Sequence, residues 1–440
     1  MIRWGRQARW PWRALGVAAC IAPEIAQAQA AASPQSGPFS VTPGLQVETA
    51  AFLQGNSWFG QSQANIGAVS KNWTETVLTP SVDWRYPLDD GSSVYGRLSA
   101  IGAATDGVDA GGSNANSPQI SAFEIEDSYV GWRSGSLFAD TLGTDAVDIT
   151  IGRLKYQLGS GFLFWKESNN GASRAANGIA PRKAARLAAD AKLSSHGWTV
   201  ETVYLKFNDR PSTHTQLAGT TIYYSGSAWG LVGFGVYKVL TSNYPNRAGM
   251  TVLNLRGDIH PIPQLRGLDL TGEYVREQNG DLLATGAGFL GIGYAFSSLP
   301  FAPYVDYRRA TFRGNSPNTT QSEAYDPFSL GISNWGSLLV GKYVLSNSNQ
   351  RANSLRLVLQ PLNRLKLTTQ VYRISLDQPL VPTGVRDFAD EVDLVAEWAA
   401  TQRLTLSVTG AVARPRAAAL EITGGDHTWS YVVLDARWAY

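Results

Sequence analysis

Basic residues recur on short segments of alternating hydrophobicity, where they could bind the carboxylate groups of a passing solute. Side chains alternate in direction along an extended chain, so a base opposite a row of apolar residues belongs to the polar face. The bases that meet this condition are Arg85, Arg97, Arg308, Arg356 and Lys366. A guanidinium is a planar, forked donor that suits carboxylates, so these residues are candidates for lining a pore.

Acidic residues are expected on the same polar face as these bases. They are Asp83, Asp190, Asp269, Glu273, Asp306, Asp393, Glu397 and Asp435. Ion pairs between neighbouring strands would then hold the wall in shape without any role in binding a solute. The sequence leaves both interpretations of the charged face open, a positive constriction or a structural ladder of ion pairs.

Residues for catalysis are hard to find. The chain contains no Gly-x-Ser-x-Gly, no His-Glu-x-x-His and no glycine-rich phosphate loop. The four histidines, His196, His214, His260 and His427, are isolated in expected turns and loops. We therefore expect no enzyme, no cofactor and no metal site. An outer-membrane hydrolase and a purely structural surface barrel remain as alternatives.

The elements that carry these residues are segments of about ten residues with a side-chain period of two. They lie at 45–54, 75–86, 92–101, 121–133, 146–156, 184–194, 197–207, 216–225, 228–238, 249–258, 267–276, 284–297, 301–312, 336–345, 352–360, 363–375, 390–399, 402–412 and 428–440, with a further candidate near 321–332. This pattern predicts an all-β fold, a transmembrane antiparallel β-barrel of about 18 strands within a range of 16 to 20. A charge on the lipid face of such a barrel costs about 2–4 kcal/mol at the midplane, so most strand charges must point inward.

The connections between these segments alternate in length. Short turn signals at 87–91, 194–197, 297–300 and 361–363 alternate with long polar links such as 102–118 and 159–181. Short turns at one end and long loops at the other are typical of the periplasmic and extracellular ends of bacterial barrels. The last segment also ends on aromatic residues, Trp438 and Tyr440, as outer-membrane barrels commonly do. We expect the barrel-assembly machinery to act on this strand.

Residues 1–30 have the features of a secretory signal peptide. Four arginines precede a short apolar run and small residues around Ala28 and Ala30, where we expect cleavage. Lipidation of Cys20, which follows Val17-Ala18-Ala19, is an alternative. Cleavage would remove the single cysteine and leave 33 basic and 34 acidic residues in place of 37 and 35. A net charge of about −1 gives no indication of nucleic-acid binding.

Residues 31–440 are expected to form one barrel. Its carboxy-terminal half contains the segments Tyr325-Asp326-Pro327-Phe328, Ser333-Asn334-Trp335-Gly336, Tyr343-Val344-Leu345-Ser346-Asn347-Ser348-Asn349, Leu355-Arg356-Leu357, Pro361, Leu376-Asp377-Gln378-Pro379 and Glu391-Val392-Asp393-Leu394 with Trp398. These segments resemble the alginate-export family of outer-membrane barrels. Earlier segments, Ser128–Arg133 and Ile151-Gly152-Arg153, are similar to strand segments of the family.

The resemblance implies a monomeric barrel that passes an acidic polysaccharide through a pore lined by basic residues. Arg153 and Arg356 lie in matched segments and are the pore residues it implies. We therefore expect an outer-membrane channel for an anionic, uronate-type saccharide, with lipid around the barrel and possible periplasmic export partners. The alternative within transport is a general or substrate-selective porin for small carboxylates or sugars.

Overall fold

The computed structural model describes residues 39–440 apart from 167–173, 176–177, 180–182, 210–211, 227–228, 317–318, 329–334, 336 and 381. The expected signal peptide, residues 1–30, lies outside the described residues, as does Cys20.

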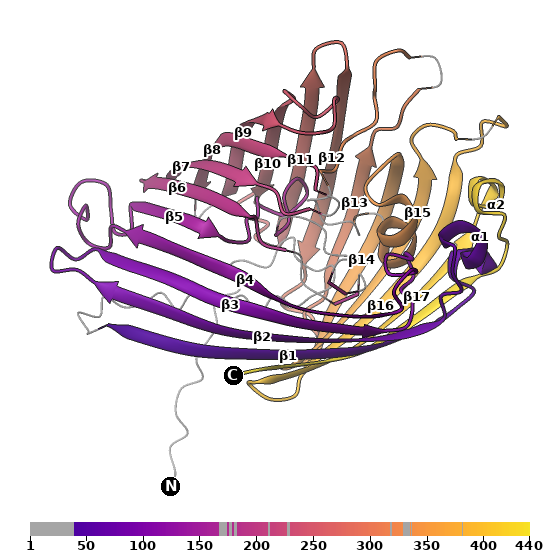
Figure 1. Cartoon of the computed structure of the whole chain (residues 1–440), viewed down its shortest axis with the longest axis horizontal. Coiled ribbons are helices and arrows are strands. Elements are labelled where there is room, and N and C mark those ends of the chain that lie inside the picture. The colour runs from indigo at the N-terminus through magenta and orange to yellow at the C-terminus, as the bar shows by residue number, and fades with distance from the viewer. Residues whose placement is uncertain are drawn as a thin grey trace, which may run out of the picture.

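Eighteen antiparallel strands form one closed barrel. Each strand pairs with its neighbours in the sequence, and β1 pairs with β18 to close the ring, with Ala51 opposite Leu434. Figure 1 shows this closure where the indigo first strand meets the yellow last strands. The strands are β1 Ser40–Gly55, β2 Asn72–Pro87, β3 Ser93–Asp106, β4 Gln119–Arg133, β5 Val147–Arg153, β6 Leu187–Ser195, β7 Trp198–Lys206, β8 Gln216–Gly226, β9 Gly230–Thr241, β10 Thr251–Ile259, β11 Leu268–Asn279, β12 Leu283–Ala295, β13 Tyr304–Phe312, β14 Gln350–Leu362, β15 Leu365–Leu376, β16 Asp387–Ala399, β17 Leu404–Pro415 and β18 Trp429–Ala439.

The predicted fold class and strand number are confirmed, and one predicted strand is wrong. Residues 336–345 were expected to be a strand, but Ser337–Leu345 form a short π-helix, η3. A short apolar run fits a buried helix as well as a buried strand, so its period alone could not decide between them. The further candidate near 321–332 contains no strand in its described part, residues 321–328.

The barrel has an apolar outer face and a polar interior. Large apolar side chains such as Phe123, Leu290 and Leu434 are exposed on the outside. Inward-facing charged residues such as Glu126 and Arg356 are buried. This inverted distribution is the one required of a wall with hydrocarbon outside and water inside.

No helix within the described residues is long and apolar enough to cross a bilayer.

Long loops and short turns lie mostly at opposite ends, as the sequence predicts. The exceptions are the link 134–146 at the short-turn end and the link 280–282 at the long-loop end. The long-loop end, which corresponds to the extracellular end of known barrels, carries the short helices η1 (Ser57–Gly60), α1 (Ser62–Ile66) and α2 (Ala417–Thr423). Phe59 of η1 packs edge-on against Trp429 of β18, with ring centroids 6.0 Å apart, and covers part of this mouth.

An outward charge at mid-strand should destabilise the barrel in a depth-dependent way. We expect Leu434→Arg to lower the free energy of unfolding in lipid vesicles by about 2–4 kcal/mol, because Leu434 lies midway along β18 on the outer face. Ser430→Arg, on the same face but at the strand end, should cost about 0–1 kcal/mol. Equal losses for the two variants, measured by urea titration, would contradict the outward assignment.

Candidate pore

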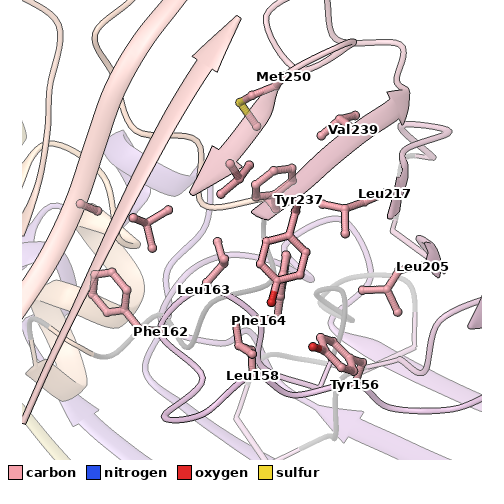
Figure 2. Packing of buried hydrophobic residues seen from close by; sticks show 14 of the residues in the cluster. Tyr156, Leu158, Phe162, Leu163, Phe164, Leu205, Leu217, Tyr237, Val239 and Met250 are labelled. Atoms are coloured by element: carbon pink, nitrogen blue, oxygen red, sulfur yellow. The ribbon is translucent and has the colours of Figure 1, made fainter. Parts of the chain in front are cut away.

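Loop L3, defined here as residues 154–186 between β5 and β6, turns into the barrel. The ring centroid of Phe162 lies 5.3 Å from that of Phe289 on β12, seven strands away around the wall. Phe164 packs edge-on against Tyr237 of β9 at 5.2 Å, and both belong to the apolar cluster in Figure 2. Strands so far apart can be contacted by one loop only if that loop crosses the lumen.

Buried ion pairs fix L3 to the wall strand β4. Glu126 has no exposed surface and accepts hydrogen bonds from Nη1 of Arg174 at 2.7 Å and from the backbone N–H of Ala184 at 2.9 Å. Lys183 donates to Glu124 at 2.9 Å. Charges removed from water are tolerated only when they are paired and hydrogen-bonded, so these contacts define where L3 lies.

A second buried carboxylate, Glu75 of β2, holds another part of L3. Its two oxygens accept the backbone N–H groups of Gly178 and Ile179, each at 2.9 Å. Oε1 also accepts the indole N–H of Trp73 at 2.8 Å. L3 is therefore attached to β2 and β4 and packed against β9 and β12, which together surround much of the lumen.

Loop L7, defined here as residues 313–349 between β13 and β14, contains η3 and is fixed to the wall strand β16. Fully buried Glu391 accepts the backbone N–H groups of Leu339 at 2.8 Å and Val340 at 3.1 Å. Asp393 accepts that of Leu338 at 3.2 Å. The first backbone N–H groups of a helix have no acceptor within the helix. In η3 the carboxylates of Glu391 and Asp393 are the acceptors for these groups.

The earlier part of L7 is attached through Asp326 to a different part of the wall. The carboxylate of Asp326 takes two hydrogen bonds from the guanidinium of Arg247, at 2.7 and 2.6 Å. Its backbone N–H donates to Glu277 of β11 at 2.9 Å. The ring of Phe328 lies 5.1 Å from the Arg247 guanidinium and is completely buried. L7 is thus fixed to β11 and to β16, five strands apart.

L3 and L7 meet inside the barrel. Phe162 of L3 contacts Trp335 of L7 edge-on, with ring centroids 5.1 Å apart. Tyr343 of η3 is buried against Tyr431 of β18, and burial raises the pKa of the Tyr343 hydroxyl well above its usual value. The hydroxyl therefore stays protonated and can serve only as a neutral hydrogen-bonding group. The two loops together narrow the lumen.

Two predicted pore bases, Arg308 and Arg356, are brought together by a shared carboxylate. Nε of Arg356 donates to Asp306, and Nη2 of Arg308 lies 3.9 Å from the same side chain. The guanidinium of Arg308 also stacks over Trp335 of L7 at 4.9 Å. Both arginines point inward and are buried. Their guanidinium groups contact the wall and L7, and little of either side chain is exposed to the lumen.

Two other predicted bases, Arg97 and Lys366, are inward and closer to solvent. Arg97 pairs with Asp83 at 3.1 Å and lies 3.6 Å from Asp127. Lys366 pairs with Glu397 at 3.3 Å and keeps 37% of its side chain exposed. Among the predicted bases that pair with a carboxylate on the inner wall, Lys366 therefore has the most exposed side chain, since that of Arg97 is 16% exposed and those of Arg308 and Arg356 are buried.

Arg153 and Arg85 complete the predicted set. Ile149 and Ile151 are exposed on the outer face, so strict alternation along β5 would turn Arg153 outward as well. Instead, Nε of Arg153 donates a hydrogen bond to the backbone oxygen of Glu126 at 2.8 Å, next to the ion pair of Glu126 with Arg174. The cause is Gly152, whose φ of +140° is open to glycine and interrupts the alternation. Arg85 is half-buried on β2 and makes no ion pair with another described residue.

The charged face of the lumen consists largely of opposite charges that lie close together on the same strand or on neighbouring strands. A further example is Lys192, which lies 3.1 Å from Asp190 and 3.4 Å from Glu201. The expected ladder of ion pairs is thus present together with the inward bases. The described residues contain no group of three His, Cys, Asp or Glu side chains that could hold a metal ion.

The residues that fix the loops were missed as functional residues by sequence reasoning. They are Glu75, Glu126, Glu277 and Glu391. Their polar-face positions could be inferred from alternation. Their loop partners could not, because each carboxylate accepts a backbone N–H of a loop residue that is far away in the sequence.

Comparison with known proteins shows the fold. No family model and no curated protein matches the chain, so the resemblance to the alginate-export family is not confirmed. Among solved structures, the Pseudomonas aeruginosa protein OccK11 (OpdR) is similar over 91% of this chain and 95% of its own, with 12% identity and a TM-score of 0.54. OccK2 (OpdF) of the same organism is similar over 91% and 97%, with 12% identity and a TM-score of 0.54. A Rhodopseudomonas blastica porin variant covers 91% and 100% at 9% identity, with a TM-score of 0.41. The likeness to the two OccK proteins shows that the chain has the barrel fold of outer-membrane porins.

Proposed function

We propose that this protein is a substrate-selective porin of the bacterial outer membrane, through which small carboxylates or sugars diffuse. The observation that carries the proposal is the attachment of L3 and L7 to buried wall carboxylates inside a closed barrel. Loops held in this way set a fixed, narrow passage. Known ligand and ion pathways use the same device, a rigid wall with a few polar groups at a constriction.

The export of an anionic polysaccharide is the less favoured function. A chain of linked uronates needs a continuous bore lined by unopposed bases. Here Phe162 and Trp335 meet within the lumen, and bases such as Arg97 and Arg356 have carboxylate partners. A polyanion would gain little from a face whose positive charge is largely neutralised locally.

The paired charges suit small solutes with both hydroxyl and carboxylate groups. Lys366 can donate to a carboxylate, and its partner Glu397 can accept from hydroxyl groups a few ångströms away. Such a pair discriminates by the arrangement of donors and acceptors, with weak binding that permits release. No covalent step is involved in this mechanism.

Solute size should decide passage. In planar-bilayer recordings, we expect glucuronate and glucose to modulate the ion current of the wild-type protein, because both fit a passage narrowed by loops. In liposome swelling, both should enter, whereas a long oligouronate should not. Rapid entry of the long oligouronate would contradict the proposal and restore polysaccharide passage.

Releasing L7 should enlarge the passage. Glu391→Gln removes the charge that holds Leu339 and Val340, and a hydrogen bond to a charged group contributes about 1.5–3 kcal/mol. The anchored population of L7 should therefore fall roughly tenfold or more. We expect a higher and noisier single-channel conductance. The matched control is Asp435→Asn, an inward carboxylate of β18 that accepts the hydroxyl group of Ser407 on the neighbouring strand β17 at 3.1 Å instead of loop N–H groups. If both variants conduct like the wild type, L7 does not set the passage.

Removing the exposed inward base should change selectivity. Lys366→Gln leaves Glu397 without its partner, so the reversal potential in a KCl gradient should shift toward cation selectivity. Inhibition of the current by glucuronate should weaken by up to about fivefold, the range for a solvent-exposed charge pair. Arg414→Gln, an exposed base at the extracellular end of β17, is the control and should leave both quantities unchanged. An unchanged reversal potential for Lys366→Gln would remove this residue from the pore.

A further inference from the structure

A pocket lies on the outer wall of the barrel, near the extracellular ends of three neighbouring strands. Its volume is about 340 Å³, and none of its lining residues is acidic. The lining residues are Lys238, Gly249, Thr251, Leu253, Arg276, Gln278, Asn279 and Gly280, from β9, β10, β11 and the adjoining loops.

This pocket faces away from the lumen. Lys238 and Arg276 are exposed, whereas the residues that precede them, Tyr237 and Val275, are buried in the interior cluster. Successive side chains on a strand point to opposite faces, so both bases point out of the barrel. The pocket is therefore separate from L3, L7 and the pore.

Both bases have N–H groups that are available to a ligand. Nζ of Lys238 donates to the backbone oxygen of Gly249 at 2.5 Å and to the hydroxyl of Thr251 at 3.1 Å, which orients the ammonium and leaves one of its three N–H groups. The side chain of Arg276 makes no ion pair or hydrogen bond with another described residue. An oriented ammonium and an unpaired guanidinium that line the same pocket are donors of the kind that oxyanions accept.

Apolar residues continue directly from the pocket toward the middle of the wall. Val236, Leu253 and Tyr274 are exposed on the same outer face. Val236 and Tyr274 precede Lys238 and Arg276 by two residues on their strands, toward the middle of the wall, and Leu253 lies between these strands on β10. A charge on this face is costly near the midplane and tolerated near the interface. The surface thus matches a molecule with an anionic head and hydrocarbon chains.

We propose that this pocket binds the phosphate-bearing sugar head group of a lipid in the outer leaflet, with its acyl chains against Val236, Leu253 and Tyr274. Phosphate is the anion that fits both a guanidinium fork and a point-charge ammonium. Basic pockets beside membrane-spanning elements recognise lipid phosphates in the same way. The pocket is large enough for a phosphate together with part of a sugar ring.

The test is binding of diphosphorylated lipid A to the full-length barrel in detergent, followed by native mass spectrometry. We expect Arg276→Gln and Lys238→Gln each to weaken binding by about fivefold, the contribution of one base near a lipid surface. The matched control is Arg373→Gln. Arg373 is also an exposed base on the outer wall, but it is already paired with Asp387 at 3.0 Å and Asp390 at 3.2 Å. This control should bind as the wild type does.

Two further probes identify the ligand chemistry. Dephosphorylated lipid A and phosphatidylcholine should bind weakly and without sensitivity to Arg276→Gln, which would support recognition of the phosphate. Equal binding of lipid A to the wild type and to both pocket variants would overturn the proposal. So would displacement of lipid A by millimolar inorganic phosphate, because the site would then bind the free anion and not the lipid.

Discussion

Buried carboxylates on the inner wall are the constraint on which the interior depends. Glu75, Glu126 and Glu391 are almost or completely inaccessible to solvent, and each receives backbone N–H groups from L3 or L7. An ionised carboxylate without such partners would cost several kcal/mol in this environment. The wall and the loops therefore satisfy each other, since the same contacts provide partners for loop N–H groups that cannot reach water.

The aromatic contacts between the loops follow from these attachments. Once L3 and L7 are fixed, Phe162, Trp335 and Phe289 come together and exclude water from the centre of the cluster. Arg308 stacks on the same tryptophan, so a base of the wall is drawn into the loop contact. L3, L7 and Arg308 on the wall strand β13 are therefore linked in one connected group of residues.

Much of the wall could be predicted from the sequence, and less of the pore. The alternation of apolar and polar residues located the 18 strands and placed Arg356 and Asp306 on the inner face. In the structure the pairing of β13 with β14 brings these two residues opposite each other. The alternation failed for residues 336–345, because an apolar run lacks a polar face to reveal its period. It would also have turned Arg153 outward, since the positive φ of Gly152 is a local irregularity that the pattern does not contain.

The sequence by itself determined which side of the wall meets lipid and which meets the lumen, because side-chain direction in a strand is a local property with a period of two. Only the tertiary structure decided where the described residues of L3 and L7 lie and which inward bases pair with carboxylates. Glu75 and Gly178 are 103 residues apart, and Arg174 and Glu126 are 48 apart. Such contacts depend on the closed barrel, which brings distant strands around one lumen, and no local pattern in the sequence records them.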